Sequence, residues 1–215
     1  MLLEINMKDQ RKQTAIKSEV PVARQRNYGE IVEFLDKHWG VPADDQLGRI
    51  KRLDTVLGGH AKKLKVIVVT GTNGKSITTN LTSKLLAEEG LKVGAFYAPH
   101  ILTYNERLIL GQETISNKDF AEVANEVINV ADANNIEVNS FEVLTMMAVM
   151  YFVSNKVDVV VFETGDKNHL DLFNMYKIDI VAITRSIDEE IRNEDTVPTE
   201  LIQSMFSLVG EGTFD

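Results

Sequence analysis

The stretch from residue 66 to residue 79 constrains the fold of this chain more than any other. An apolar, β-branched run from Val66 to Val69 ends in a turn with two glycines, and a helical pattern follows the pair Lys75–Ser76. In this order of strand, loop and helix, the backbone N–H groups of the loop and the helix N-terminus cradle phosphate oxygens. Lys75 would then reach the terminal phosphates of a nucleotide, and the Ser76 hydroxyl would face a magnesium ion. The residues predicted to bind the nucleotide are Gly71, Thr72, Asn73, Gly74, Lys75 and Ser76.

This loop departs from the strict phosphate-binding pattern, which has a glycine five positions before the Gly–Lys pair. Val69 stands at that position, so a shorter motif remains, Gly-Thr-Asn-Gly-Lys-Ser. The alternative is a tight strand-to-helix turn that contains a lysine by chance. The flanking strand and helix favour the phosphate loop, because its mechanism needs both.

Charge and composition exclude several classes of protein. The formal net charge of −9 argues against a protein that binds nucleic acid by general attraction to phosphates, although nucleotide binding needs only local positive groups. With no cysteine, the chain has no disulfide and no thiolate metal site. Its first residues are too few and too acidic for a signal peptide, and no apolar run approaches the roughly 20 residues of a membrane helix. We therefore expect a cytoplasmic protein without nucleic-acid or membrane partners.

Residues 1–26 and residues 27–215 differ in pattern. The first are rich in Lys, Arg, Gln and Glu without a lasting period, which predicts a disordered or loosely docked tail. From residue 27 on, strand-like apolar runs alternate with helical patterns, which predicts one α/β domain with a three-layer, P-loop-type, mostly parallel sheet and helices on both faces. Ligands of such sheets lie at the carboxyl ends of the strands. The segments expected along that edge are residues 70–76, 98–107, 163–174 and 184–190.

Four motifs along the chain carry a resemblance to a known family. They are the loop Gly71–Ser76, the segment Ala98-Pro99-His100 followed by Tyr104-Asn105-Glu106-Arg107, the pair Phe141–Glu142, and Val157–Asp158 leading to Phe162-Glu163-Thr164-Gly165. In order and spacing they resemble folylpolyglutamate synthase and dihydrofolate synthase, which are relatives of the Mur ligases. The resemblance covers about residues 28–188 and implies the family's N-terminal ATP-binding domain, with a fold like the central domain of Mur ligases.

What this resemblance implies is an ATP-dependent ligase. Family members phosphorylate a carboxylate of a pteroate or a folate, and the amine of L-glutamate then attacks the acyl phosphate. Magnesium bridges the phosphates of ATP. Carried over to this sequence, residues 72–76 hold ATP, while Glu142 and Ser76 hold Mg²⁺. The residues expected to contact the pterin-bearing substrate are Pro99, His100, Tyr104, Asn105 and Arg107.

Several positions depart from the family's pattern. Ala98 stands where the family has a magnesium-binding serine, and Asp188–Glu189 stands where it has an Asp–His pair. The Glu189 carboxylate is a candidate substitute for that histidine, since carboxylates bind magnesium. No lysine follows residue 185, where the family has a carbamylated one, and residues 166–169 replace a glycine-rich turn. The chain also stops where the family continues into a C-terminal domain, so we expect an intact nucleotide site and an isolated chain without ligase activity.

Plainer explanations exist for some of these residues. Glu142 begins a helix, where the helix dipole favours a carboxylate in any case. His100 and His169 have no partner at metal-ligand spacing, which disfavours a zinc site. The acidic residues 188–190 also suit a solvated helix start. Three functions stay open: a folate-type ligase, alone or with a partner chain that supplies the missing domain; a degenerate ATP-binding relative with a regulatory or interaction role; and a Mur-type ligase for another carboxylate.

Overall fold

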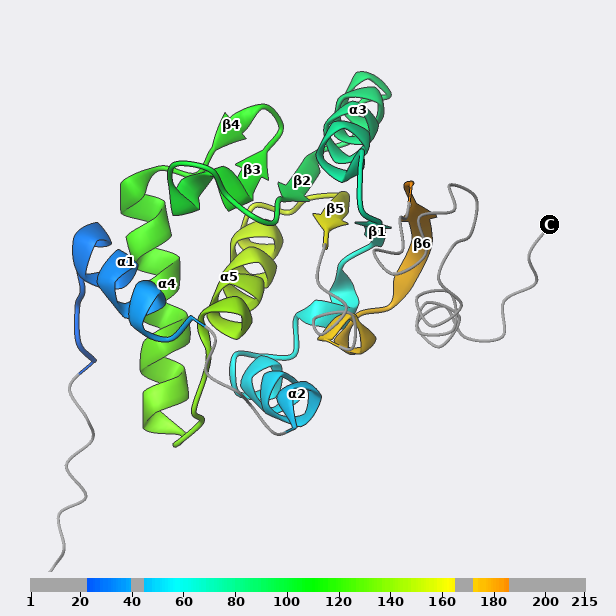
Figure 1. Cartoon of the computed structure of the whole chain (residues 1–215). Coiled ribbons are helices and arrows are strands. Elements are labelled where there is room, and N and C mark those ends of the chain that lie inside the picture. Colours follow the sequence, from blue (N-terminus) through cyan, green and yellow to red (C-terminus); the bar gives the residue numbers. More distant parts are fainter. Residues whose placement is uncertain (1–22, 40–44, 165–171, 186–215) are drawn as a thin grey trace, which may run out of the picture.

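The described part of the chain is built around one sheet with the strand order β4-β3-β2-β5-β1-β6 (Figure 1). The structure is a computed structural model, and it describes residues 23–39, 45–164 and 172–185. Strands β1, β2, β5 and β6 run parallel, while β3 and β4 continue the sheet antiparallel at one edge. The predicted mostly parallel sheet is therefore confirmed. The strands are β1 (Val66–Thr70), β2 (Val93–Phe96), β3 (Leu108–Leu110), β4 (Glu113–Thr114), β5 (Val159–Glu163) and β6 (Ile178–Ile183).

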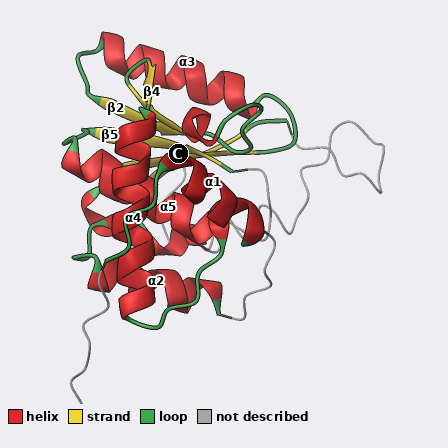
Figure 2. Ribbon diagram, turned by 90° about the vertical axis from the view of Figure 1, so that its left-hand side faces the viewer, coloured by secondary structure: helices red, strands yellow, loops and turns green. Residues whose placement is uncertain are grey.

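Helices cover both faces of this sheet. The helices are α1 (Tyr28–Lys37), α2 (Gln46–Val56), α3 (Lys75–Glu88), α4 (Asn117–Ala133) and α5 (Ser140–Ser154), with short 3₁₀ segments η1 (Ala61–Lys63) and η2 (Tyr104–Arg107). Figure 2 shows α3 on one face of the sheet and α1, α2, α4 and α5 on the other, so the three predicted layers are present. Within the described residues, none of the helices has both the length and the apolar character that crossing a membrane requires.

The core follows from the alternation of side chains along the central strands. Successive residues of a strand point to opposite faces, so a strand covered on both sides is apolar throughout. Val66 and Val68 of β1 join a large cluster on the side of α5, a helix that is apolar almost all round. Ile67 and Val69 join a smaller cluster that Leu86 closes from α3. The continuous apolar runs in the sequence are therefore explained by burial on two faces.

One edge of the sheet is completed by two short strands. The short extended stretch expected at residues 108–110 forms β3, which pairs antiparallel with β2 and places Leu110 opposite Gly94. Gly111, with a φ of 64°, makes the turn into β4. The short strands gain their hydrogen bonds from β2, a partner that a local pattern does not reveal.

The ordered domain begins before Asn27. The backbone N–H of Arg26 donates to Asn125 Oδ1 over 2.8 Å, and Asn125 Nδ2 donates to the Arg26 carbonyl over 2.7 Å. Arg26 Nη1 also donates to Asn129 Oδ1. The last residues of the expected tail are thus fastened to α4, whereas residues 1–22 lie outside the described residues.

Candidate nucleotide and substrate site

The loop after β1 has the backbone that its glycines suggest. Gly71 has a φ of 131°, and a Cβ at this position would lie 3.0 Å from the carbonyl oxygen of Thr184. Gly74, with a φ of 88°, is the N-cap of α3, which begins at Lys75. Other residues adopt such left-handed angles only with strain. The chain therefore passes directly from a buried strand into a helix whose first N–H groups have no partner within the helix.

Hydrogen bonds to Arg185 and one bond inside the loop fix the conformation of the phosphate loop. The N–H groups of Thr72 and Asn73 donate to the carbonyl oxygen of Arg185 over 2.8 and 3.0 Å. Lys75 Nζ donates to the Thr72 carbonyl oxygen over 3.1 Å, so the lysine folds back over its own loop. The N–H groups at the start of α3 are then the ones that an anion can use, because a helix N-terminus favours negative charge.

Glu163 is the acidic residue next to this loop, and it was not assigned a role from the sequence. Strand β5 pairs with β1 so that Glu163 lies opposite Val69. Ser76 Oγ donates to Glu163 Oε1 over 2.8 Å. Glu163 is 1% exposed, and its Oε2 has no hydrogen-bond partner among the described residues. Burial raises the pKa of Glu163, and the Ser76 hydrogen bond and the charges of Lys75 and Arg107 oppose this rise.

Ser76 and Glu163 together fit a magnesium ion. Mg²⁺ prefers hard oxygen ligands and is usually held by one or two protein groups, with phosphate oxygens and water completing its shell. The hydroxyl of Ser76 and the unpartnered, buried oxygen of Glu163 are ligands of this kind. Across residues 23–39, 45–164 and 172–185, no cluster of three or more His, Asp or Glu side chains could hold a metal. An ion here would therefore depend on the phosphates of a bound nucleotide.

Glu142, a predicted magnesium ligand, has protein partners on both of its carboxylate oxygens. It is fully buried near the start of α5, where its Oε2 accepts from the N–H of Asn139 over 2.8 Å in a capping box. Its Oε1 accepts from Arg49 Nη2 of α2, also over 2.8 Å. Protein donors thus occupy both oxygens, while Ser76 pairs with Glu163. Glu142 thus caps a helix and joins two helices, and its predicted binding of magnesium stays a prediction.

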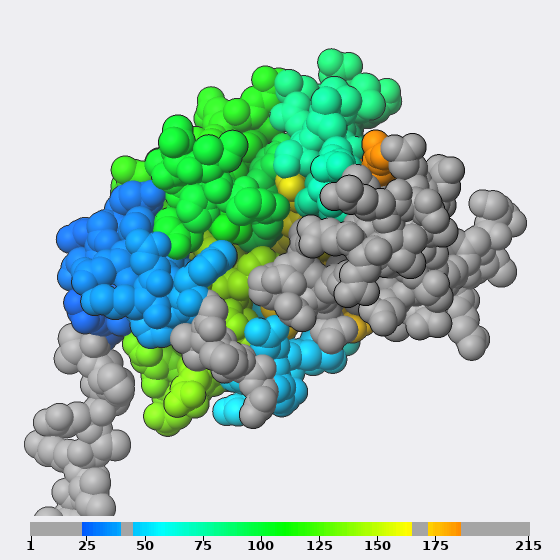
Figure 3. Space-filling model, in the orientation of Figure 1, coloured from blue at the N-terminus to red at the C-terminus, as the bar shows by residue number. Residues whose placement is uncertain are grey.

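Three of the predicted substrate residues lie together after β2. Arg107 is 2% exposed, and its Nε donates to His100 Nδ1 over 2.8 Å. The guanidinium carbon lies 5.1 Å from the ring centroid of Trp39, just after α1, and 6.0 Å from that of Tyr104. The hydroxyl of Tyr104 donates to Asp36 Oδ1 over 2.7 Å. Figure 3 shows that the green part of the chain, which follows β2, fills the surface between the blue α1 and the teal α3.

The other two predicted substrate residues have different surroundings. Asn105 is buried, and its Nδ2 donates to the Ile115 carbonyl over 2.7 Å and to Asn117 Oδ1 over 3.0 Å, which fastens η2 to the start of α4. Pro99 lies exposed next to His100. The loop between them is shaped by Glu106, whose carboxylate accepts from the N–H groups of residues 101, 102 and 103. Asn105 is therefore part of the scaffold and lies apart from the group formed by Arg107, His100, Tyr104 and Trp39, which we call the Arg107 cluster.

Some sequence-based predictions lie outside the described residues. These are the candidate metal ligand Glu189, the acidic residues 188–190, and His169 with residues 166–169, which stand where the family has a glycine-rich turn. Ala98 is described, and it packs against the large core cluster.

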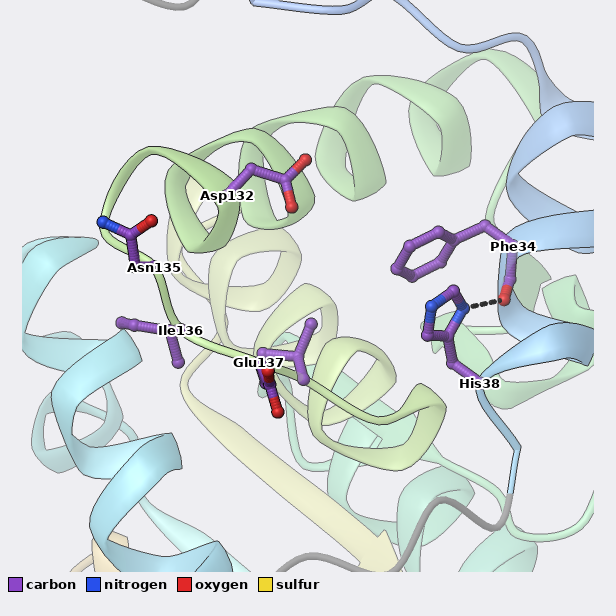
Figure 4. Close-up of a pocket in the computed structure, with 7 residues that line it drawn as sticks. Phe34, His38, Asp132, Asn135, Ile136 and Glu137 are labelled. Carbon is purple, nitrogen blue, oxygen red and sulfur yellow. Dashed lines mark hydrogen bonds between the residues drawn. The ribbon is translucent and has the colours of Figure 1, made fainter.

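A separate hollow of about 520 Å³ lies between the end of α1 and the connection from α4 to α5. Figure 4 shows Phe34 and His38 facing Asp132 and Glu137 across it. His38 Nδ1 bonds the Phe34 carbonyl oxygen, and Asp132 pairs with Arg26. The hollow shares no residue with the phosphate loop or the Arg107 cluster, and none of its residues was singled out from the sequence.

The fold and the site define a class of protein: an α/β domain of the P-loop type, with a serine of the loop bonded to a buried glutamate. A scan against protein-family models finds no match for the chain. Named relatives do match. The chain is 36% identical over 161 residues to the dihydrofolate synthase/folylpolyglutamate synthase of Haemophilus influenzae, which covers 74% of this chain and 36% of that protein. It is 35% identical over 143 residues to the enzyme of the same name from Bacillus subtilis, covering 64% of this chain and 33% of that protein.

Solved structures agree with these relatives. A bifunctional folylpolyglutamate synthase/dihydrofolate synthase with Mn, AMPPNP and L-glutamate bound superposes with a TM-score of 0.66 at 28% identity, over 77% of this chain and 39% of that chain. The matched part of this chain therefore belongs to the folylpolyglutamate synthase/dihydrofolate synthase family, as the four motifs indicated. The chain spans about a third of the length of the curated relatives it matches, 33% and 36%.

Proposed function

We propose that this chain carries the nucleotide site and the acid-substrate site of an ATP-dependent ligase that joins L-glutamate to a folate or pteroate carboxylate. The observation that carries the proposal is the Ser76 hydroxyl bonded to the buried Glu163 carboxylate at the start of α3. Two findings support it: the named relatives are synthases of this kind, and a solved relative binds AMPPNP, Mn and L-glutamate.

Each part of the site has a role in this chemistry. The phosphates of ATP lie on the loop Gly71–Ser76, and Lys75 leaves the Thr72 carbonyl for the β- and γ-phosphates. Ser76 and Glu163 hold Mg²⁺, which neutralises charge on the phosphates. An oxygen of the substrate carboxylate attacks the γ-phosphorus, and the bond from that phosphorus to ADP breaks. The amine of L-glutamate then attacks the acyl carbon, the carbon–oxygen bond to phosphate breaks, and the nitrogen loses a proton.

Two other functions considered from the sequence have less support. The degenerate ATP-binding relative gains no support, because the named relatives are synthases and the Ser76–Glu163 pair is present. A partner chain that completes the ligase stays a prediction.

Calorimetry of Mg-ATP binding to the purified chain tests the nucleotide site. Lys75→Ala removes a charged contact to the phosphates and should weaken binding by about tenfold or more. Lys84→Ala is the matched control, because Lys84 lies exposed further along the same helix. Absence of heat at millimolar ATP would contradict the proposal. Equal affinity of the wild type and Lys75→Ala would show that ATP binds elsewhere.

A further inference from the structure

Arg107 is a buried cation without a carboxylate partner. It is 2% exposed, and the one hydrogen bond of its guanidinium to the described residues runs from Nε to the uncharged acceptor His100 Nδ1. A buried charge costs free energy unless it is paired, and the rings of Trp39 and Tyr104 offset part of that cost. Burial accordingly lowers the pKa of Arg107 to about 10.

The carboxylates around Arg107 have other partners or do not reach it. Asp36 Oδ1 accepts from the Tyr104 hydroxyl. Glu106 accepts three backbone N–H groups of its own loop. Glu163 accepts from Ser76 with one oxygen, and its other oxygen bonds no described residue. The guanidinium fork of Arg107 is thus built into the site without an anion from the described protein.

The position of Arg107 places it at the reacting edge of the sheet. Its carbonyl oxygen accepts from the N–H of Tyr97, which directly follows β2. Strand β2 pairs with β5 so that Phe96 lies opposite Phe162, one residue before Glu163. The charges of Arg107 and Glu163 each influence the pKa of the other, as neighbouring groups do. Arg107 therefore lies one strand away from the proposed magnesium ligands.

We propose that Arg107 binds the carboxylate of the acid substrate, the group that accepts the phosphoryl group from ATP. This inference rests on the proposed function and replaces, for Arg107, the expected contact with the pterin. A guanidinium binds a carboxylate through two parallel hydrogen bonds, which fixes the plane of the carboxylate. Such orientation next to the γ-phosphate lowers the entropic cost of phosphoryl transfer. The same cation would face the acyl phosphate after transfer.

His100 is the positioning residue in this arrangement. Its Nδ1 accepts from Nε, which leaves both terminal nitrogens of Arg107 for the ligand. The Trp39 ring packs on the guanidinium and limits its movement. Removal of the acceptor at position 100 should therefore weaken carboxylate binding even though Arg107 is still present.

The test compares an acid with its ester. Pteroate and pteroate methyl ester are titrated by calorimetry into the full chain saturated with AMPPNP and Mg²⁺. The wild type should bind the acid more tightly than the ester. The ratio of the affinity for the acid to the affinity for the ester (the acid-to-ester ratio) should fall on the order of 10–100-fold in Arg107→Gln. The affinities for AMPPNP and for the ester should not change. Arg52→Gln is the matched control, since Arg52 is exposed on α2.

Each outcome separates the inference from the proposed function. A chain that binds AMPPNP but keeps its acid-to-ester ratio in Arg107→Gln would show that Arg107 is only a structural cation. A wild type that binds AMPPNP but does not distinguish acid from ester would also overturn the inference. A chain that binds no AMPPNP would refute the proposed function itself.

The partly buried His100 offers a second route if Arg107→Gln does not fold. His100→Leu should lower the acid-to-ester ratio. His100→Gln, whose amide oxygen can accept from Nε, should restore most of it. Equal ratios in both His100 variants and in the wild type would contradict the positioning role.

Discussion

Glu163→Gln should change the stability of the free protein and its response to nucleotide in opposite directions. In the free protein, Glu163 buries a carboxylate whose Oε2 has no partner, and burial raises its pKa. Glutamine keeps an oxygen for the Ser76 hydroxyl but removes the charge. We expect a gain of about 1 kcal/mol in the free energy of unfolding, the usual scale for one unsatisfied buried group. For a chain of this length that is about 2–4 °C in the melting temperature.

The bound protein should show the reverse order. A ligand at 100 times its Kd stabilises the wild type by about 2.7 kcal/mol, which corresponds to roughly 5–10 °C. The variant lacks the carboxylate that we propose to hold Mg²⁺ and should lose most of this shift. Thermal melts with and without Mg-ATP are the assay: the variant should melt above the wild type when free and below it when Mg-ATP is present.

The effect of pH has a definite sign. Because the pKa of Glu163 is raised in the folded state, the folded protein binds this proton more tightly than the unfolded chain. The resulting stability is fully present below the unfolded pKa and is lost as the pH rises through the folded pKa. The stability advantage of Glu163→Gln should therefore grow across this acidic window and level off above it.

Glu142→Gln is the matched control for the other candidate carboxylate. It weakens the pairing with Arg49, so the free protein should lose about 1.5–3 kcal/mol, the scale of a hydrogen bond to a charged group. The shift caused by Mg-ATP should remain. The reasoning fails if Glu163→Gln keeps a full Mg-dependent shift, or if Glu142→Gln is the variant that loses it.

Two further changes test the loop and the neighbouring turn. Gly71→Ala puts a Cβ against Thr184 at a left-handed φ, so the free energy of unfolding should fall by about 1–3 kcal/mol and ATP should bind more weakly. Urea unfolding and calorimetry measure the two effects, and unchanged stability would contradict the close approach. Ala98→Ser restores the hydroxyl of the family's turn and should lower the Mg²⁺ concentration needed for ATP binding in a magnesium titration. If that concentration does not change, position 98 does not have the magnesium-binding role that the resemblance implies.

Local sequence was sufficient for the phosphate loop and the central strands. A β-branched run buried on both faces is apolar at every position, so β1 and β5 could be predicted without knowing their neighbours. Gly71 and Gly74 mark left-handed backbone, and Lys75 begins the helix, because these preferences belong to single residues and their immediate neighbours. The four motifs then identified the family.

Tertiary structure decided which side chains meet. Glu142 and Glu163 are both acidic residues at element ends, and only the pairing of β5 with β1 shows that Glu163 reaches Ser76. The bond from Arg49 to Glu142 is likewise a contact between distant segments, whereas the capping box that holds the other Glu142 oxygen is local. Burial of Arg107 depends on Trp39, 68 positions earlier in the sequence, and on a hairpin that pairs with β2. A local pattern carries residue preferences, whereas the free energy of a charge depends on the partners and the burial that the folded chain brings to it.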